Sequence, residues 1–80
     1  MNADEILVEL TEIMRETFNT PSLEVNPGMN AKDVKGWDSL SNIRLIVSIE
    51  EHFNIRLSTS EVMQLQNIGS FIDLIAKKTA

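Results

Sequence analysis

Apolar residues recur at helical spacing near the amino terminus of the chain. The stripe consists of Ile6, Leu7, Leu10, Ile13, Met14, Thr17 and Phe18. Intervals of three and four residues place such side chains on one face of an α-helix. Asn2 is placed to cap the start of this helix, and Glu5 completes a capping box. With Asn19 and Pro21 as typical end signals, the pattern predicts a helix over about residues 4–18.

The stretch from Asn19 to Asp38 has no sustained period. It is rich in Pro, Gly, Asn and Asp, which favour turns, and its apolar anchors are Leu23, Val25, Met29, Val34 and Trp37. A loop of about twenty residues is uncommon in a compact domain and usually serves a function. We therefore expect a long connection with one short helical turn around Ala31–Val34.

The run after Asp38 is the most hydrophobic part of the chain. Its positions at helical spacing are Leu40, Ile43, Ile46, Val47, Ile49 and Phe53, and Leu45 widens the stripe to most of the circumference. This pattern predicts a second helix with more apolar surface than contact with one core requires.

Two further helices are predicted in the last third of the chain. Ser58 and Glu61 have capping-box spacing, which predicts a short helix through Val62, Met63 and Leu65. Asn67 or Ser70 is available to cap the last helix, of about ten residues. The stripe of this helix is Ile68, Phe71, Ile72 and Ile75, and Lys77 and Lys78 suit its negative end.

The fold class follows from these elements. β-Branched residues leave 44–49 and 53–58 open to a strand interpretation, but the helical period and the caps favour helices. Three longer helices, a short third helix and a long loop between the first and second predict an all-α fold. The expected architecture is a small antiparallel four-helix bundle that forms one domain over residues 1–80.

Composition excludes several classes of function. The 80 residues, 42% of them hydrophobic, are too few to build a large core and also wall a deep catalytic cleft. The chain has no Cys and one His, which excludes disulfides, a thiolate nucleophile and a Cys/His metal site. Ser39 and His52 are thirteen residues apart, about 20 Å along one helix, which excludes a hydrolytic Ser–His pair.

The formal charge of −5 arises entirely within the first 24 residues. Such charge repels nucleic-acid phosphate and anionic lipid, so we expect neither nucleic acid nor membrane as a partner, but basic protein surfaces. There is no basic signal-peptide region, and no apolar run approaches the roughly 20 residues of a membrane span. We expect a cytoplasmic protein, and a monomer because no heptad seam is sustained.

The sequence Gly-Trp-Asp-Ser-Leu at 36–40 joins the long loop to the second helix. Asp38 suits the cap position, and Ser39 falls in the first turn, where free N–H groups favour a bound anion. A phosphate on Ser39 would therefore be well placed. Asp and Ser are also common helix starters, so both residues can have a purely structural role.

In these motifs the chain resembles the acyl carrier protein family, which includes peptidyl and D-alanyl carriers. The resemblance covers nearly the whole chain and rests on GWDSLSNIRLIVSIEEHF, FNIRLSTSE and NIGSFIDLI. It implies a covalent 4′-phosphopantetheine on Ser39, in the motif with Asp38 and Leu40, and no catalysis by the chain itself. The implied role is to hold an acyl or aminoacyl group as a thioester in lipid or fatty-acid biosynthesis. The implied partners are a phosphopantetheinyl transferase and acyl-loading and acyl-transfer enzymes. The alternative is a helical interaction module in which Ser39 is only a helix starter.

The resemblance also implies a partner-binding face on the second helix. Its expected residues are the apolar ridge Leu40, Ile43 and Val47 and the acids Asp38, Glu50 and Glu51, which would meet basic docking surfaces. Ser41 and Arg44 stand where the family usually has acids. Arg44 is thus available to a carboxylate of a dedicated partner or to Glu50 and Glu51, or it is simply solvated. These departures imply a specialised member.

An acyl cavity is implied between the second, third and fourth helices. Its expected lining is Ile46, Leu57, Val62, Leu65, Ile68 and Phe71. Because Val62 and Phe71 are larger than the residues frequent there, we expect short or polar cargo. Trp37 is expected to stabilise the loop or shape the surface beside the arm. Met14, Met29 and Met63 are expected to fill the core, and His52 to favour the carbonyl end of its helix.

Overall fold

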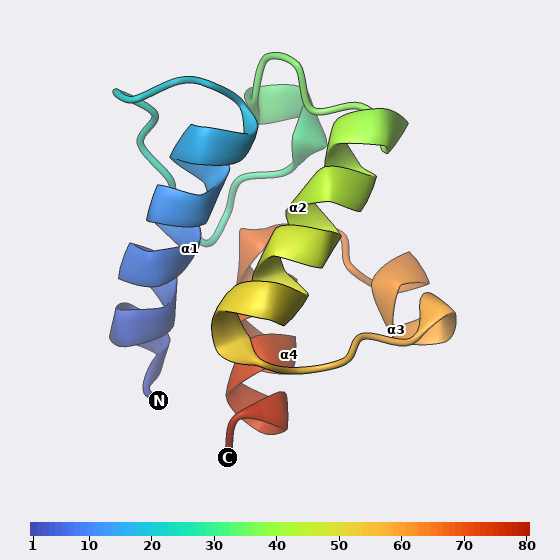
Figure 1. Ribbon diagram of the computed structural model, residues 1–80. Coiled ribbons are helices and arrows are strands. Elements are labelled where there is room, and N and C mark those ends of the chain that lie inside the picture. Colours follow the sequence, from blue (N-terminus) through green and yellow to red (C-terminus); the bar gives the residue numbers. More distant parts are fainter.

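The computed structural model describes all 80 residues and contains only helices and loops. The elements are α1 (Ala3–Thr17), the 3₁₀ turn η1 (Ala31–Asp33), α2 (Ser39–Phe53), α3 (Thr59–Met63) and α4 (Ile68–Lys78). This confirms the all-α fold with three longer helices, one short helix and a long first loop. α1 packs against both α2 and α4 and runs opposite to them, whereas α2 and α4 run in the same direction (Figure 1). No helix is both long enough and apolar enough to span a bilayer.

Local hydrogen bonds define where each helix begins. All five helical elements start with a capping box, formed by the pairs Asn2–Glu5, Asn30–Asp33, Asp38–Ser41, Ser58–Glu61 and Asn67–Ser70. The predicted caps Asn2, Ser58 and Asn67 are confirmed. α3 ends at Met63 rather than at Leu65, because the N–H groups of Gln64 and Leu65 turn back three residues to Glu61 and Val62.

One core holds the three longer helices together. It is formed by Ile6, Leu10, Ile13, Met14, Val34, Leu45, Ile49, Ile68, Phe71, Ile72 and Ile75. Burying each Leu, Ile or Met side chain contributes about 1.5–3 kcal/mol relative to leaving it exposed. From α2 the buried apolar residues are Leu45 and Ile49, so the opposite side of this apolar helix faces solvent.

The long loop is fastened to the helices by backbone groups. Ile68 N–H donates to Met29 O and Gly69 N–H donates to Pro27 O, each at 2.8 Å. The Arg15 guanidinium donates to Leu23 O at 2.7 Å. The predicted turn is present as η1, and Val34 behind it is buried. These contacts hold the loop against α1 and the start of α4.

One side chain makes a contact that was not predicted, and another is exposed although it was predicted to be in the core. His52 lies in the last turn of α2, as expected for the carbonyl end, but it also reaches α1, with Nε2 2.7 Å from Glu9 Oε1. Met63 is 80% exposed, so the prediction that it fills the core is wrong. The physical reason is that the short α3 turns only its other apolar side chain, Val62, partly inward, together with Leu65 beyond its end.

Candidate functional site

The chain enters α2 through a tight, fully bonded turn. Gly36 has φ +88°, a conformation that side-chain-bearing residues rarely adopt. Ser41 N–H donates to Asp38 Oδ1 at 2.9 Å, and Asp38 N–H donates to Ser41 Oγ at 2.8 Å. The Ser41 hydroxyl in turn donates to Gly36 O at 2.7 Å. Ser41 is 3% exposed, and its side chain belongs to this turn. It is therefore not part of the solvent-facing surface on which an acidic side chain would meet a partner.

Ser39 has the opposite environment, although it is only two positions away. Its side chain is exposed, and its hydroxyl makes no hydrogen bond within the chain. As the first residue of a helix of 15 residues, it lies where unpaired N–H groups and the helix dipole favour negative charge. The Ser39 hydroxyl is therefore both accessible and close to a site that tolerates an anion.

The Asp38 carboxylate acts as a helix cap. The N–H and then the hydroxyl of Ser41 donate to it and lower its pKa below the ordinary value, so it is ionised at neutral pH. His52 lies in the last turn of α2, at the far end from Ser39. The carboxylate beside Ser39 is thus a weak base that is already engaged as the helix cap, so efficient deprotonation of this hydroxyl requires a base from another molecule.

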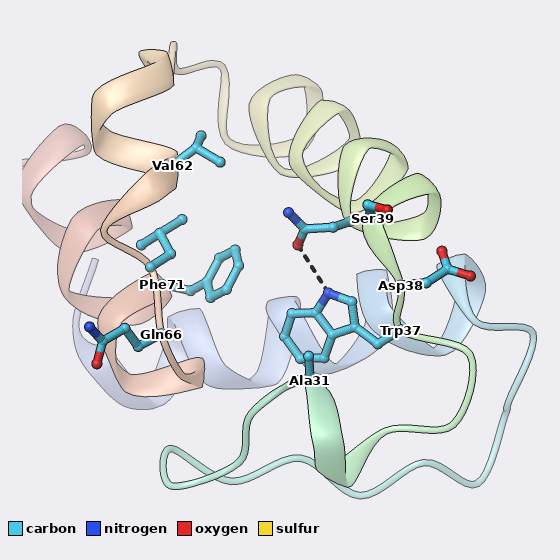
Figure 2. A pocket seen from close by; sticks show the side chains of 9 residues that line it. Ala31, Trp37, Asp38, Ser39, Val62, Gln66 and Phe71 are labelled. Atoms are coloured by element: carbon cyan, nitrogen blue, oxygen red, sulfur yellow. Dashed lines mark hydrogen bonds between the residues drawn. The ribbon is translucent and has the colours of Figure 1, made fainter.

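A pocket of about 330 Å³ opens beside Ser39 (Figure 2). It is lined by Ala31, Trp37, Asp38, Ser39, Asn42, Val62, Leu65, Gln66 and Phe71. The Trp37 indole N–H donates to Asn42 Oδ1 at 3.0 Å, the bond drawn dashed in Figure 2. Figure 2 shows Val62 across the pocket from Ser39, with the Trp37 and Phe71 rings on one side of the pocket, below the line that joins them.

The structure brings only half of the predicted cavity residues to this pocket. Val62, Leu65 and Phe71 line it, whereas Ile68 is fully buried, and Ile46 and Leu57 pack against the core elsewhere. Asn42 was not predicted. Its signal was weak, since an Asn one turn into a helix is ordinarily solvated, and its bond to Trp37 depends on how the loop folds.

The predicted partner-binding residues occupy different surroundings. Leu40, Ile43 and Val47 are 70%, 61% and 45% exposed. Arg44 lies among them, is exposed and forms no ion pair, so the alternative pairing with Glu50 or Glu51 does not occur. The Glu50 carboxylate instead accepts the Leu57 N–H at 2.9 Å. Glu51 lines a groove with Glu16 and His52, toward α1.

Comparison with known proteins agrees with this geometry. The family model described as phosphopantetheine attachment site matches residues 8–75. The acyl carrier protein of Acidothermus cellulolyticus is 35% identical over 79 residues, which cover 99% of this chain and 94% of the relative. The acyl carrier protein of Guillardia theta is 31% identical over 80 residues, covering 100% and 99%.

Solved structures give the same result. The holo acyl carrier protein from Geobacter metallireducens superposes with a TM-score of 0.85 at 40% identity, over 90% of this chain and 83% of that one. An acyl carrier protein from Thermotoga maritima, 24% identical over 98% of this chain and 91% of that one, shares the fold with a TM-score of 0.83. The chain therefore belongs to the acyl carrier protein family, whose members are carriers rather than enzymes, and it contains a phosphopantetheine attachment site.

Proposed function

We propose that this protein holds an acyl or aminoacyl group as a thioester on a 4′-phosphopantetheine arm attached to Ser39 and delivers it to partner enzymes. The observation that carries the proposal is the contrast between two neighbouring serines. The Ser41 hydroxyl is buried and fully bonded, whereas the Ser39 hydroxyl is exposed and unbonded at the start of α2.

The residues around Ser39 fit a phosphodiester. The first turn of α2 offers N–H groups to the phosphate, and the hydroxyl can be esterified without breaking a hydrogen bond. Asp38 is held in the capping box, which fixes the helix start and so the position of Ser39. The arm, when attached, supplies a flexible chain that ends in a thiol.

Attachment requires a separate phosphopantetheinyl transferase. The Ser39 oxygen forms a bond to the phosphorus of coenzyme A that bears pantetheine, and the bond from this phosphorus to adenosine 3′,5′-bisphosphate breaks. The hydroxyl proton passes to a base of the transferase, since the neighbouring Asp38 carboxylate is a weak base engaged as the helix cap. The protein contributes only an accessible nucleophile in a fixed place.

Leu40, Ile43 and Val47 form the proposed docking ridge, with Arg44 among them. Asp38 and Glu51 are exposed carboxylates near the two ends of α2 and attract the basic docking surfaces of acyl-loading and acyl-transfer enzymes. Arg44 adds a planar donor group suited to a carboxylate, which favours specialised partners with an acid at that place. This combination supports a specialised carrier.

Intact mass after incubation with coenzyme A and a broad-specificity transferase tests the attachment. The wild type and Ser22→Ala, which removes another exposed serine, are expected to gain one phosphopantetheinyl group, and Ser39→Ala none. No gain by the wild type, with the transferase active on a known carrier, would contradict the proposal. It would favour the alternative of a helical interaction module.

A further inference from the structure

Two side chains hold the backbone that leads into Ser39. Asp38, the residue directly before it, is bonded to Ser41 in the capping box. Trp37, one residue earlier, reaches over the first turn of α2, and its indole N–H donates to Asn42 Oδ1 at 3.0 Å (Figure 2). The backbone N–H of Asn42 donates to Asp38 O at 2.9 Å. The bond between the Trp37 and Asn42 side chains therefore spans Ser39, from two residues before it to three residues after it.

The Trp37 ring is also packed against two other helices. Its centroid lies 5.7 Å from that of Phe18, the residue that ends α1, and 6.0 Å from that of Phe71 in α4. The planes are tilted in both pairs, an arrangement that stabilises one orientation of the ring. Trp37 thus connects the start of α2, through Asn42, to both α1 and α4.

The Ser39 side chain itself has no such restraint. It is exposed, and its hydroxyl makes no hydrogen bond within the chain. The place of its oxygen is therefore set by the backbone alone. On the amino-terminal side this backbone comes from an exposed turn at Lys35 and Gly36. The restraint on that side comes from the side chains of Asp38 and Trp37.

We infer that Trp37 is a positioning residue for phosphopantetheine transfer and that it acts through its hydrogen bond to Asn42. The inference rests on the proposed attachment at Ser39. In that transfer the Ser39 oxygen approaches phosphorus in line with the bond that breaks, and small displacements from a reactive geometry cost large factors in rate. The proposed docking ridge of α2 does not include Trp37. Loss of the bond therefore slows transfer within the complex and leaves the affinity of the complex unchanged.

The test measures single-turnover transfer from coenzyme A to the carrier over a range of transferase concentrations, with the transferase in excess. The limiting rate constant reports transfer within the complex, and the half-saturating concentration reports docking. Asn42→Leu keeps the size of the side chain but removes the acceptor. It is expected to lower the limiting rate about tenfold, since one neutral hydrogen bond changes an equilibrium by up to about that factor. The half-saturating concentration is expected to stay the same.

Matched variants separate positioning from a general loss of stability. Asn42→Asp keeps an oxygen that accepts the indole N–H and is expected to transfer at the wild-type limiting rate. Thr11→Val removes a part-buried hydrogen bond from α1, in which Thr11 Oγ1 donates to Leu7 O at 2.7 Å, and is expected to leave the rate unchanged.

A double variant tests whether the two side chains act through one bond. Trp37→Phe removes the donor and keeps an aromatic ring. The double variant of Trp37→Phe and Asn42→Leu is expected to be no slower than the slower of the two single variants, because the bond can be lost only once. If Trp37→Phe unfolds, Asn42→Leu and Asn42→Asp decide alone, since both change only a half-buried side chain of α2.

The outcomes distinguish the inference from the proposed function. A wild-type limiting rate in Asn42→Leu, an equal loss in Asn42→Asp or Thr11→Val, or additive losses in the double variant would overturn the inference alone. No transfer to the wild type, with the transferase active on a known carrier, would overturn both.

Discussion

In the first turn of α2, Ser41 stabilises the start of the helix, whereas Ser39 presents the hydroxyl that is proposed to be modified. Ser41 faces the loop and closes the turn with its N–H, which donates to Asp38, and its hydroxyl, which accepts from Asp38 N–H and donates to Gly36 O, so it determines where α2 begins. Ser39 contributes nothing to that network and keeps its hydroxyl free. Replacing Ser41 should therefore lower the stability of the fold, and replacing Ser39 should prevent attachment of phosphopantetheine.

Replacing these serines by alanine tests that division. Ser41→Ala removes a buried hydroxyl and half of a capping box, so the free energy of unfolding should fall by about 1–2 kcal/mol. Ser39→Ala should change it by less than about 0.5 kcal/mol, as at other exposed positions. Urea denaturation followed by circular dichroism measures both. An equal loss in the two variants would show that Ser39 also supports the fold.

Glu61 makes the stability of the fold depend on pH in the acidic range. The Ser58 N–H, then the Lys78 ammonium, lower its pKa from 4.5 to about 2. Because the folded-state pKa is below the unfolded one, this stabilisation is complete above about pH 4.5 and is lost as the pH falls toward 2. Glu61→Gln should flatten the fall in melting temperature between pH 6 and pH 3, whereas Glu24→Gln, an exposed carboxylate outside the helices, should not.

At the scale of elements, α2 has two apolar faces with different uses. Leu45 and Ile49 pack into the core, and Leu40, Ile43 and Val47 remain exposed. The exposed face includes Arg44, while Glu50 binds the loop before α3 and Glu51 faces a groove shared with α1. The middle of the proposed docking ridge is therefore positive rather than acidic.

Reversing the charge of Arg44 tests how this residue affects the docking of a partner enzyme. For a transferase with a basic docking surface, Arg44→Glu should raise kcat/KM by up to about tenfold at low salt, because like-charge repulsion becomes attraction. The gain should shrink at high salt. Lys77→Glu makes the same change of charge on α4 and is the control. An equal gain in both variants would indicate net charge rather than docking at Arg44.

At the scale of the whole molecule, the site depends on how the long loop packs against the helices. Gly69 at the start of α4 lies so close to the loop that an added Cβ would be 3.2 Å from the Pro27 carbonyl oxygen. That oxygen already accepts the Gly69 N–H at 2.8 Å, so a retreat lengthens and weakens this bond. The packing of the loop against α4 therefore favours a glycine at position 69.

Gly69→Ala tests this dependence. Despite the better helix propensity of alanine, the free energy of unfolding should fall by about 1–3 kcal/mol, as for overpacked sites. Gly28→Ala is the control, because its Cβ would meet only the Asn26 side chain at 3.4 Å. Thermal denaturation compares the two variants. A Gly69→Ala protein as stable as the wild type would show that the loop shifts easily.

The fold was largely predictable from the sequence because helix period and capping boxes are local. Asn2, Ser58 and Asn67 act as caps through bonds to residues three positions away. Which apolar side chains are buried and which are exposed was less predictable. Leu45 and Ile43 are both apolar, and the packing of α2 in the core, chiefly against α1, decides which is buried. Met63 was misplaced for the same reason.

The candidate site was predictable where it depended on one short motif. Asp38 and Ser39 could be singled out from helix-start chemistry and family resemblance. The bonds of Trp37 to Asn42 and of His52 to Glu9 could not, since the first depends on the seating of the loop and the second joins two helices. Of the six residues expected to line an acyl cavity, Val62, Leu65 and Phe71 line the pocket beside Ser39, whereas Ile46, Leu57 and Ile68 pack with the core.

The Trp37 side chain also gives the molecule an optical reporter. It is the only tryptophan of the chain, and its ring forms a wall of the pocket beside Ser39. Indole emission shifts in wavelength and intensity when water next to the ring is replaced. Arrival or departure of a group in the pocket therefore changes the fluorescence of the unlabelled protein, so occupancy of the pocket can be followed in real time during turnover by a partner enzyme.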